Sequence, residues 1–544
     1  MIIETGSTRT RLALGVLFGP DLAETADPAL IEWIERRPHQ WRQAVRVLWH
    51  ASGRPGAEAG LPAAPPHPQP RTPPEPEPAL LSRVLVETRP PETTVDWRGR
   101  TVLVLGDGAD LAIAVDNALR AAGARTESVT LRETVRLHVN ERAGQVMTAA
   151  ELAKRLHDEP QPDWLFLLTS RTTPRSTNIG PVDAVHVRAA MGALREVLAA
   201  RKGGLTAAVT ALDGRFGETG TVPLDPVAGA MAGLLRGHTQ SRVLDVAPSV
   251  GVDEVARGLL AFVDGTPDHR ELGFDGATWV TPAFTPARLG EKTGLPLEPG
   301  STVIAAGGAR GRAAEVLAAM AAEVPCRYVL LGRTPLVNIY ATLGVGDRDY
   351  VLSMSAEEFE EHRIRQRESL KANSPDFSEE EFEAYWARLS RSLDVMRTIG
   401  RMRDAGAQVE YVQQDVTDSH AVRRLGQELR SRGLRIHGLV HAAAHGDESD
   451  AEAWDRTIAT RINGFYHLAP LLDDQVRLVA LLGSSSGGSA ESAGSGFLVP
   501  LADRLAAEFP QARVRSVHSA AASVITAALR SPQAPRTLVE RAGR

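Results

Sequence analysis

A serine- and glycine-rich segment behind a strand-like apolar run holds residues suited to nucleophilic chemistry. Residues 478–488 read LVALLGSSSGG and place Ser485 at the centre of a G-x-S-x-G pattern. In α/β-hydrolases this pattern puts an activated serine on a sharp turn between strand and helix, and an acid and a histidine follow in the chain. Asp503 and His518 follow in that order. A Ser485–Asp503–His518 hydrolase is therefore one alternative, although more serines and glycines stand where the helix should begin.

A second motif, a glycine turn, is suited to holding phosphate. Gly307 and Gly311 follow the apolar run STVIAA and precede helical sequence, with Ala313 in the place of a last glycine. Such a turn lets the backbone approach a pyrophosphate at a helix N-terminus. Arg333 ends the next apolar run, where an acidic residue would select NAD and a guanidinium favours a 2′-phosphate. The pattern predicts an NADPH-type site, with Arg312 discordant because an apolar residue would pack better at the turn.

The elements that must position these motifs alternate between strand and helix. Apolar runs separated by helical segments begin at Trp97, and the same alternation starts again at Ser301. This alternation is typical of α/β proteins with parallel sheets. We therefore expect two tandem Rossmann-like, doubly wound parallel sheets. The first is a truncated structural subdomain at 97–297, and the second is a catalytic-type subdomain at 298–544.

Three further segments lie outside this alternation. Apolar residues at helical spacing predict a helical head at 1–51, and prolines predict a stiff linker at 52–96. A helical insertion is expected at 337–403, where Ser355 and Glu358 have capping-box spacing. Its apolar stripe favours covering a sheet edge or a domain contact over touching a substrate.

Composition excludes several classes of function. The 544 residues are 43% hydrophobic, enough for more than one core, and the net charge of -6 with no basic block gives nucleic acid no attraction. The single cysteine, Cys326, excludes an intrachain disulfide framework and a cysteine-rich metal site, and no metal is expected. The sequence shows no signal peptide and no apolar run of roughly 20 residues, so we expect a cytoplasmic protein without a membrane partner.

Five segments together resemble a known family. They are GGARGRAAE at 307–315, LLGRTPL at 330–336, SLDVMRTIGRMRDAGAQVEYVQQDVTD at 392–418, GLVHAAA at 438–444 and RINGFYHL at 461–468. With them, residues 97–544 resemble the ketoreductase unit of polyketide and polyunsaturated fatty-acid synthases, a short-chain dehydrogenase fold behind a truncated structural subdomain. The resemblance implies NADPH-dependent reduction of β-ketoacyl thioesters on an acyl carrier protein, with other synthase subunits or domains as partners.

The resemblance also implies which residues hold the cofactor. They are Gly307, Gly308, Arg310, Gly311, Ala313 and Arg333 at the turn and the second strand, Asp415 and Val416 beside the adenine, and His441, Ala442 and Ala443 along the cofactor.

The catalytic groups that the family needs are only partly present. A ketoreductase uses a serine to orient the carbonyl, a tyrosine to protonate the alkoxide and a lysine to lower the pKa of the tyrosine. The resemblance places the serine at Ser484 or Ser485, but the tyrosine position falls on Leu498 and the lysine position on Arg461. No tyrosine follows Tyr466. Because a positioned acid contributes roughly 10²- to 10⁴-fold, we expect an impaired enzyme with a structural role.

Three alternatives remain open at this point. In the first alternative, the chain is an active reductase with a substitute proton donor such as His518 or a loop serine. In the second, it is the Ser485–Asp503–His518 hydrolase. In the third alternative, the chain is an interaction protein without catalytic activity, and its cofactor site no longer binds a cofactor.

Overall fold

The protein is described by a computed structural model. Its described residues are 80–92, 96–106, 110–134, 145–168, 181–219, 226–238, 240–264, 269–343, 348–443, 450–483, 489–519 and 521–540. The helical head expected at 1–51 lies outside these residues, as does most of the linker expected at 52–96.

The chain divides into two compact units. Residues 1–77 and 345–362 form one unit, and residues 78–344 and 363–544 form the other. In the first unit, the described residues form α12 (Arg348–Ser353) and the beginning of α13. Every described strand belongs to the second unit.

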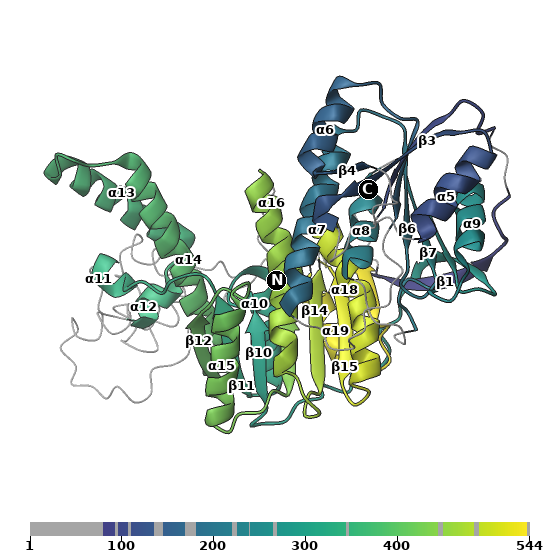
Figure 1. The fold of residues 1–544 in the computed structure, drawn as a ribbon. Coiled ribbons are helices and arrows are strands. Elements are labelled where there is room, and N and C mark those ends of the chain that lie inside the picture. Colours follow the sequence, from purple (N-terminus) through teal and green to yellow (C-terminus); the bar gives the residue numbers. More distant parts are fainter. Residues whose placement is uncertain are drawn as a thin grey trace, which may run out of the picture. The chain divides into compact units, whose positions relative to one another are not determined.

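The described strands form one sheet where the sequence predicted two. Its order is β12-β11-β10-β13-β14-β15-β16-β1-β9-β8-β7-β6-β5-β2-β3-β4 (Figure 1). The join is β1 (Leu80–Thr88), which pairs antiparallel with β16 (Thr537–Glu540) on one side and with β9 (Trp279–Pro286) on the other. The linker prediction is therefore wrong for Leu80–Thr88, because LLSRVLVET contains no proline and its apolar residues suit a strand that is paired on both edges.

The structural half is a doubly wound sheet, as predicted. Its parallel strands are β2 (Thr101–Leu105), β3 (Arg125–Leu131), β4 (Gln145–Met147), β5 (Trp164–Leu168), β6 (Leu205–Thr210), β7 (Ser241–Val246) and β8 (Glu271–Phe274). Its helices are α5 (Asp110–Ala121), the 3₁₀ turn Arg132–Thr134, α6 (Ala149–Asp158), α7 (Pro181–Ala200), α8 (Pro226–Arg236) and α9 (Val252–Asp264). Helices α5 and α9 cover one face, and α6, α7 and α8 cover the other (Figure 1).

The second half repeats this architecture. Its parallel strands are β10 (Thr302–Ala306), β11 (Arg327–Gly332), β12 (Gln408–Gln413), β13 (Gly438–His441), β14 (Leu478–Gly483), β15 (Arg513–His518) and β16. Its helical elements are α10 (Gly311–Glu323), α15 (Ser419–Ser431), α16 (Ala451–Ile458), the π-helical turn Ala459–Asn463, α17 (Gly464–Leu468), the 3₁₀ turn Ala469–Leu471, α18 (Ser489–Glu508) and α19 (Ala522–Arg530). None of the described helices combines the length and apolar composition that crossing a membrane requires.

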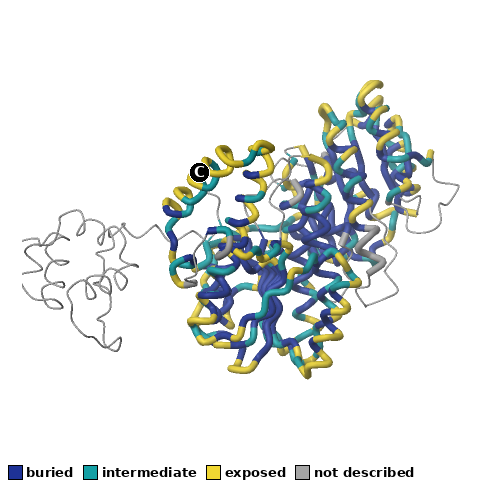
Figure 2. Tube along the Cα trace, turned by 90° about the vertical axis from the view of Figure 1, so that its left-hand side faces the viewer, coloured by how far each residue is buried: buried dark blue, intermediate teal, exposed yellow. Residues whose placement is uncertain are grey.

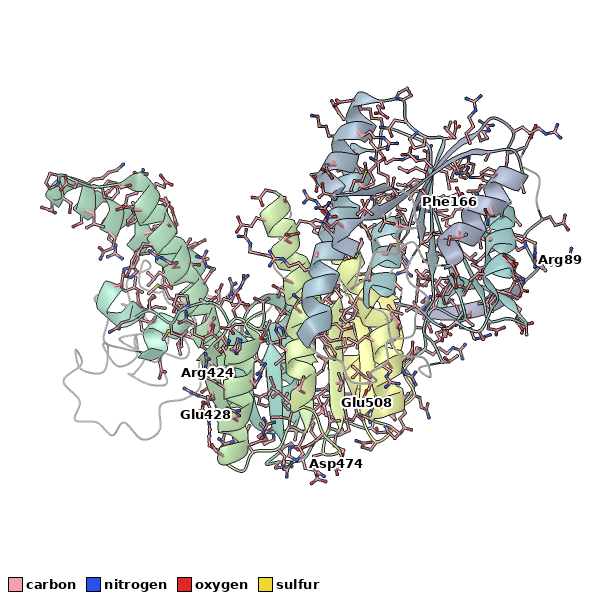
Figure 3. The ribbon with its side chains drawn as sticks, viewed as in Figure 1. Arg89, Phe166, Arg424, Glu428, Asp474 and Glu508 are labelled. Carbon is pink, nitrogen blue, oxygen red and sulfur yellow. The ribbon has the colours of Figure 1, made fainter. Side chains whose placement is uncertain are left out.

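One apolar core passes through both halves. It contains residues of α6, α7 and α8 together with residues of α15, α17 and α18. Figure 2 shows buried segments in the interior and exposed segments on the outside. Figure 3 shows the same contrast, with Phe166 inside the structural half and Arg424, Glu428, Asp474 and Glu508 at the outer surface.

Glycines bring α8 and α18 together at the centre of this core. A Cβ on Gly233 would lie 2.2 Å from the carbonyl oxygen of Ser492, and a Cβ on Gly496 would lie 2.5 Å from Cα of Gly233. The two helix backbones therefore touch, and no larger side chain fits between them. The helix that follows the serine loop is thereby fixed against the structural half.

The insertion is helical, as the pattern of 337–403 predicted. It contains α11 (Ile339–Leu343), α12, α13 (Ala356–Asn373) and α14 (Glu379–Asp404). The capping box forms: the Ser355 N–H donates to Glu358 Oε2 at 2.8 Å, and the Glu358 N–H donates to Ser355 Oγ at 3.1 Å. Helix α14 packs on α10 and on β12, the edge strand of the sheet, with its apolar stripe largely buried.

Candidate functional site

A cleft lies where the strand order of the second half reverses. Strand β10 is followed in the chain by β11 on one side, and the chain later returns to β13 on the other side. In doubly wound sheets, ligands bind outside the carboxyl ends of the strands at this switch point. A cleft of about 1050 Å³ lies there, lined by residues that follow β10, β11, β12 and β13 and by the first turn of α10.

The glycine turn has the geometry that close approach to a ligand requires. Gly307 has φ of +76°, and a Cβ there would lie 2.6 Å from Cα of Ala443. A Cβ on Gly308 would lie 2.2 Å from Leu317 Cδ1. Helix α10 then begins with Arg310 as its N-cap, and no side chain caps it. The turn therefore presents uncapped backbone N–H groups, which favour an anion.

Most of the cofactor residues implied by the resemblance meet in this cleft. Its lining includes Gly307, Arg310, Gly311, Ala313, Arg333, Asp415, Val416, Ala442 and Ala443. The Asp415 carboxylate accepts hydrogen bonds from the backbone N–H and the hydroxyl of Thr417, at 2.9 and 2.8 Å, and so closes its own turn.

Two of the expected cofactor residues lie behind the wall of the cleft. Gly308 packs on α10 as described above, and His441 is fully buried at the end of β13. The His441 Nε2 lies 2.8 Å from the carbonyl oxygen of Arg461. Burial lowers the pKa of His441 to about 4, so its imidazole is neutral near pH 7. Neither residue is among those that line the cleft in the described part of the chain.

Helix α14 supplies cleft residues that the sequence analysis did not identify. Arg388, Arg391, Asp394 and Val395 line the cleft beside the residues of the glycine turn. The insertion was predicted to cover a sheet edge. One face of α14 does so, and another face lines the cleft. The signal was present in the sequence, because Arg388 and Arg391 are spaced i, i+3 and lie off the apolar stripe.

Arg312 spans the other side of the switch point. One of its guanidinium nitrogens donates to the carbonyl oxygen of Gly483 at 2.9 Å, and the other donates to the carbonyl oxygen of Ser519. Gly483 ends β14, and Ser519 follows β15. Partial burial lowers the pKa of Arg312, and the nearby charge of Glu491 opposes this shift. The guanidinium therefore lies across the ends of two strands away from Arg333.

At the position that the resemblance assigns to the lysine, the guanidinium of Arg461 is paired with a carboxylate. Arg461 lies in the π-helical turn with 1% of its surface exposed, and its Nη2 lies 2.5 Å from Glu491 Oε2. Its other terminal nitrogen donates to the carbonyl oxygen of Leu482. Glu491 was missed by the sequence analysis, although it is the single charged residue between Arg477 and Asp503.

The tyrosine position lies in the core. Leu498 has no exposed surface and packs in the core that joins the two halves. Tyr466 is also buried, with its ring 5.6 Å from that of Phe497. Ser484 and Ser485 lie outside the described residues. At the positions that are described, neither a phenol nor an ammonium is present.

The other candidates for proton transfer are engaged elsewhere. His518 is buried, and its Nε2 lies 2.9 Å from Ser516 Oγ. Burial first, and then the charge of Arg461, lower the pKa of His518 to about 3. The Asp503 carboxylate pairs with Arg536 at 2.5 Å instead of with His518. The acid and the histidine of the hydrolase alternative are therefore not bonded to each other. Among the described residues, no cluster of acids, histidines and cysteines is arranged for a metal ion.

The described residues form a Rossmann-like α/β fold with a cleft at the switch point of its second half. The family model of the KR domain matches residues 301–499. No curated protein sequence matches the chain.

Solved structures agree with this family match. The chain is similar to an N-terminal ketoreductase from the macrolactin assembly line, with 12% identity, a TM-score of 0.59 and coverage of 85% of this chain and 91% of that one. It is also similar to an A1-type ketoreductase, with 17% identity, a TM-score of 0.51 and coverage of 81% and 82%. The described residues have the fold of these ketoreductases, so the fold that the resemblance implied is confirmed, and the family model supports the resemblance over residues 301–499.

A multidomain structure from a keto acid-selecting NRPS module, with adenylation, ketoreductase and pseudo Asub domains, is similar as well. The identity is 13% and the TM-score is 0.58, with coverage of 86% of this chain and 39% of that one.

Proposed function

We propose that this chain is a catalytically silent ketoreductase-like component of a polyketide- or fatty-acid-type synthase, with a structural role in the assembly. The observation that carries the proposal is Leu498, a fully buried apolar residue at the position of the tyrosine, in a chain with no tyrosine after Tyr466. The KR-domain match of residues 301–499 supports the type of protein.

Reduction of a β-keto group needs a hydride at the carbonyl carbon and a proton at the carbonyl oxygen. NADPH would supply the hydride when bound. The chain must supply the proton, and Leu498 holds none. Arg461 keeps a positive charge, but Glu491 compensates it within hydrogen-bonding distance. The residues around Leu498 and Arg461 therefore do not fit the reduction.

The residues of the cleft fit the phosphate-bearing part of NADPH better than its reactive part. The glycine turn, the uncapped N-terminus of α10 and Arg333 suit a pyrophosphate and a 2′-phosphate. We accordingly propose that this chain still binds a nucleotide, although it no longer catalyses the reduction.

The remaining expectations form part of the same proposal. The structural subdomain at 97–297 and the KR-type subdomain at 298–544 would act as one body, since one sheet and one core pass through both. Synthase domains, including an acyl carrier protein, are the proposed partners. The cytoplasm is the proposed location.

A turnover assay tests the proposal. The full chain is incubated with NADPH and acetoacetyl-N-acetylcysteamine, and the absorbance of NADPH is followed beside an active ketoreductase as a positive control. We expect no loss above the rate without protein. Turnover that Arg461→Ala abolishes would overturn the proposal and favour the alternative of an active reductase with a substitute proton donor. Hydrolysis of the thioester without loss of NADPH would instead favour the serine-loop hydrolase.

A further inference from the structure

We propose that the cleft binds an adenosine nucleotide that carries a ribose phosphate in addition to its 5′-phosphate, and that Arg312 excludes the nicotinamide half of a dinucleotide. The ligand class is a ribose-phosphorylated adenosine nucleotide rather than a complete NADPH. This inference rests on the proposed function only in that it takes the same cleft as the nucleotide site.

The charge of the cleft selects a ligand with several phosphates. Five arginines line it, namely Arg310, Arg312, Arg333, Arg388 and Arg391, against the two carboxylates of Asp394 and Asp415. The Asp415 carboxylate is engaged in its own turn. Within the described part of the chain, Arg310 and Arg391 form no ion pair, and both are exposed to the cleft. Guanidinium groups bind phosphate with paired N–H donors, so the cleft favours a highly anionic ligand.

The arginines are distributed unevenly between the two sides of the switch point. Arg333 follows β11, while Arg388 and Arg391 belong to α14, which packs on β12 and α10. These residues surround the side of the cleft where the adenosine half of a dinucleotide would lie. This half of the cleft is open and strongly positive.

The opposite half is spanned by Arg312. The second nucleotide of a dinucleotide lies across the switch point from the first, over the ends of the strands on that side. There the Arg312 guanidinium bonds to the carbonyl groups of Gly483 and Ser519, the residues at the ends of β14 and β15. A nicotinamide nucleotide entering this half would have to break both bonds.

Binding measurements on the full chain test this inference. Isothermal titration with 2′,5′-ADP, 3′,5′-ADP, 5′-AMP and NADPH compares the ligands directly. We expect a ribose phosphate to increase affinity over 5′-AMP by at least about tenfold, and NADPH to bind no more tightly than 2′,5′-ADP. The 2′ and 3′ isomers show which ribose phosphate the cleft prefers.

A variant that removes the guanidinium separates the two halves. In Arg312→Leu we expect the affinity for NADPH to rise by about tenfold, while the affinity for 2′,5′-ADP changes by less than about threefold. Arg312→Gln provides a second, polar variant in case the leucine variant does not fold. The control is Arg423→Leu, at an exposed arginine on the outer face of α15, which should change neither affinity.

The outcomes distinguish this inference from the proposed function. Failure of every nucleotide to bind, or wild-type binding of NADPH about tenfold tighter than 2′,5′-ADP, would overturn the inference and leave a catalytically silent protein intact. Turnover of a β-ketoacyl thioester would overturn the proposed function, whatever the ratio of affinities.

Discussion

Arg461 and Glu491 form a buried ion pair at the position that the resemblance assigns to a lysine. Their nitrogen and oxygen atoms lie 2.5 Å apart, and 2% and 10% of the two side chains are exposed. Glu491 lies in the first turn of α18, the helix that also carries Leu498. The first turn of this helix thus supplies the carboxylate that compensates the charge of Arg461. The pair also fixes α18 to the end of β14, because Arg461 bonds to the carbonyl of Leu482.

Breaking this pair from one side should destabilise the protein strongly. Glu491→Gln leaves a buried guanidinium without its carboxylate, which costs about 3–5 kcal/mol of the free energy of unfolding. In the double variant Arg461→Met with Glu491→Gln, the loss should be smaller than the sum of the two single losses. Urea denaturation of the four proteins of this double-mutant cycle measures the difference.

An exposed pair provides the control for this cycle. Arg456 and Glu452 are separated by 2.9 Å with 40% and 77% of their side chains exposed, so Glu452→Gln should cost no more than about 0.5 kcal/mol. Additive losses at Arg461 and Glu491 would show that the buried pair is not coupled.

Restoring the tyrosine alone should not restore activity. Leu498 is fully buried, so Leu498→Tyr adds ring atoms and a hydroxyl to a filled core and should cost about 1–3 kcal/mol. Arg461 is also paired with Glu491 and is not a free cation. Thermal unfolding should show a lower Tm, and the NADPH assay should show no turnover. A folded Leu498→Tyr variant that reduces acetoacetyl-N-acetylcysteamine would show that the phenol was the single missing group.

Part of the fold was predictable because some strands are buried along their whole length. The continuous apolar runs STVIAA and LVALLG match β10 and β14, parallel strands whose residues are all buried between two layers of helices. The joining strands β1 and β16 were missed because their residues are only partly buried or the strand is very short. Pairing at such edges depends on partners far away in the chain, which periodicity does not reveal.

The site was only partly predictable for a related reason. The glycine turn and Arg333 carry local signals, and the structure brings them to one cleft. The roles of Arg312 and Glu491 depend on residues far away in the chain. Arg312 donates a hydrogen bond to the carbonyl of Gly483, and Glu491 pairs with the guanidinium of Arg461. A sequence shows that such charges are unusual in their surroundings, but it does not show their partners.

Separating α8 from α18 should destabilise both halves together. Gly233→Ala places a Cβ 2.2 Å from the backbone oxygen of Ser492, and the backbone of α18 has to move to accommodate it. We expect a loss of about 1–3 kcal/mol, measured by urea denaturation. The matched control is Gly203→Ala, since a Cβ on Gly203 meets no atom within 4 Å. Equal stability of the two variants would mean that the close helix contact is not formed.

Because His518 is neutral in the folded protein, the free energy of unfolding should depend on pH. Burial, followed by the charges of Arg461, Arg236 and Arg312, lowers its pKa in the folded protein to about 3, whereas an unfolded histidine titrates near 6.5. As the pH falls below about 6.5, the unfolded chain binds a proton that the folded protein does not bind. The contribution of His518 to stability is therefore complete above this pH and is lost by about 1.4 kcal/mol per pH unit below it. His518→Gln keeps a polar atom near Ser516 Oγ and does not titrate, so its stability relative to the wild type should improve by about 2 kcal/mol between pH 6.5 and pH 5. Urea denaturation at both pH values measures this change, and an identical pH dependence in the two proteins would show that folding does not lower the pKa of His518.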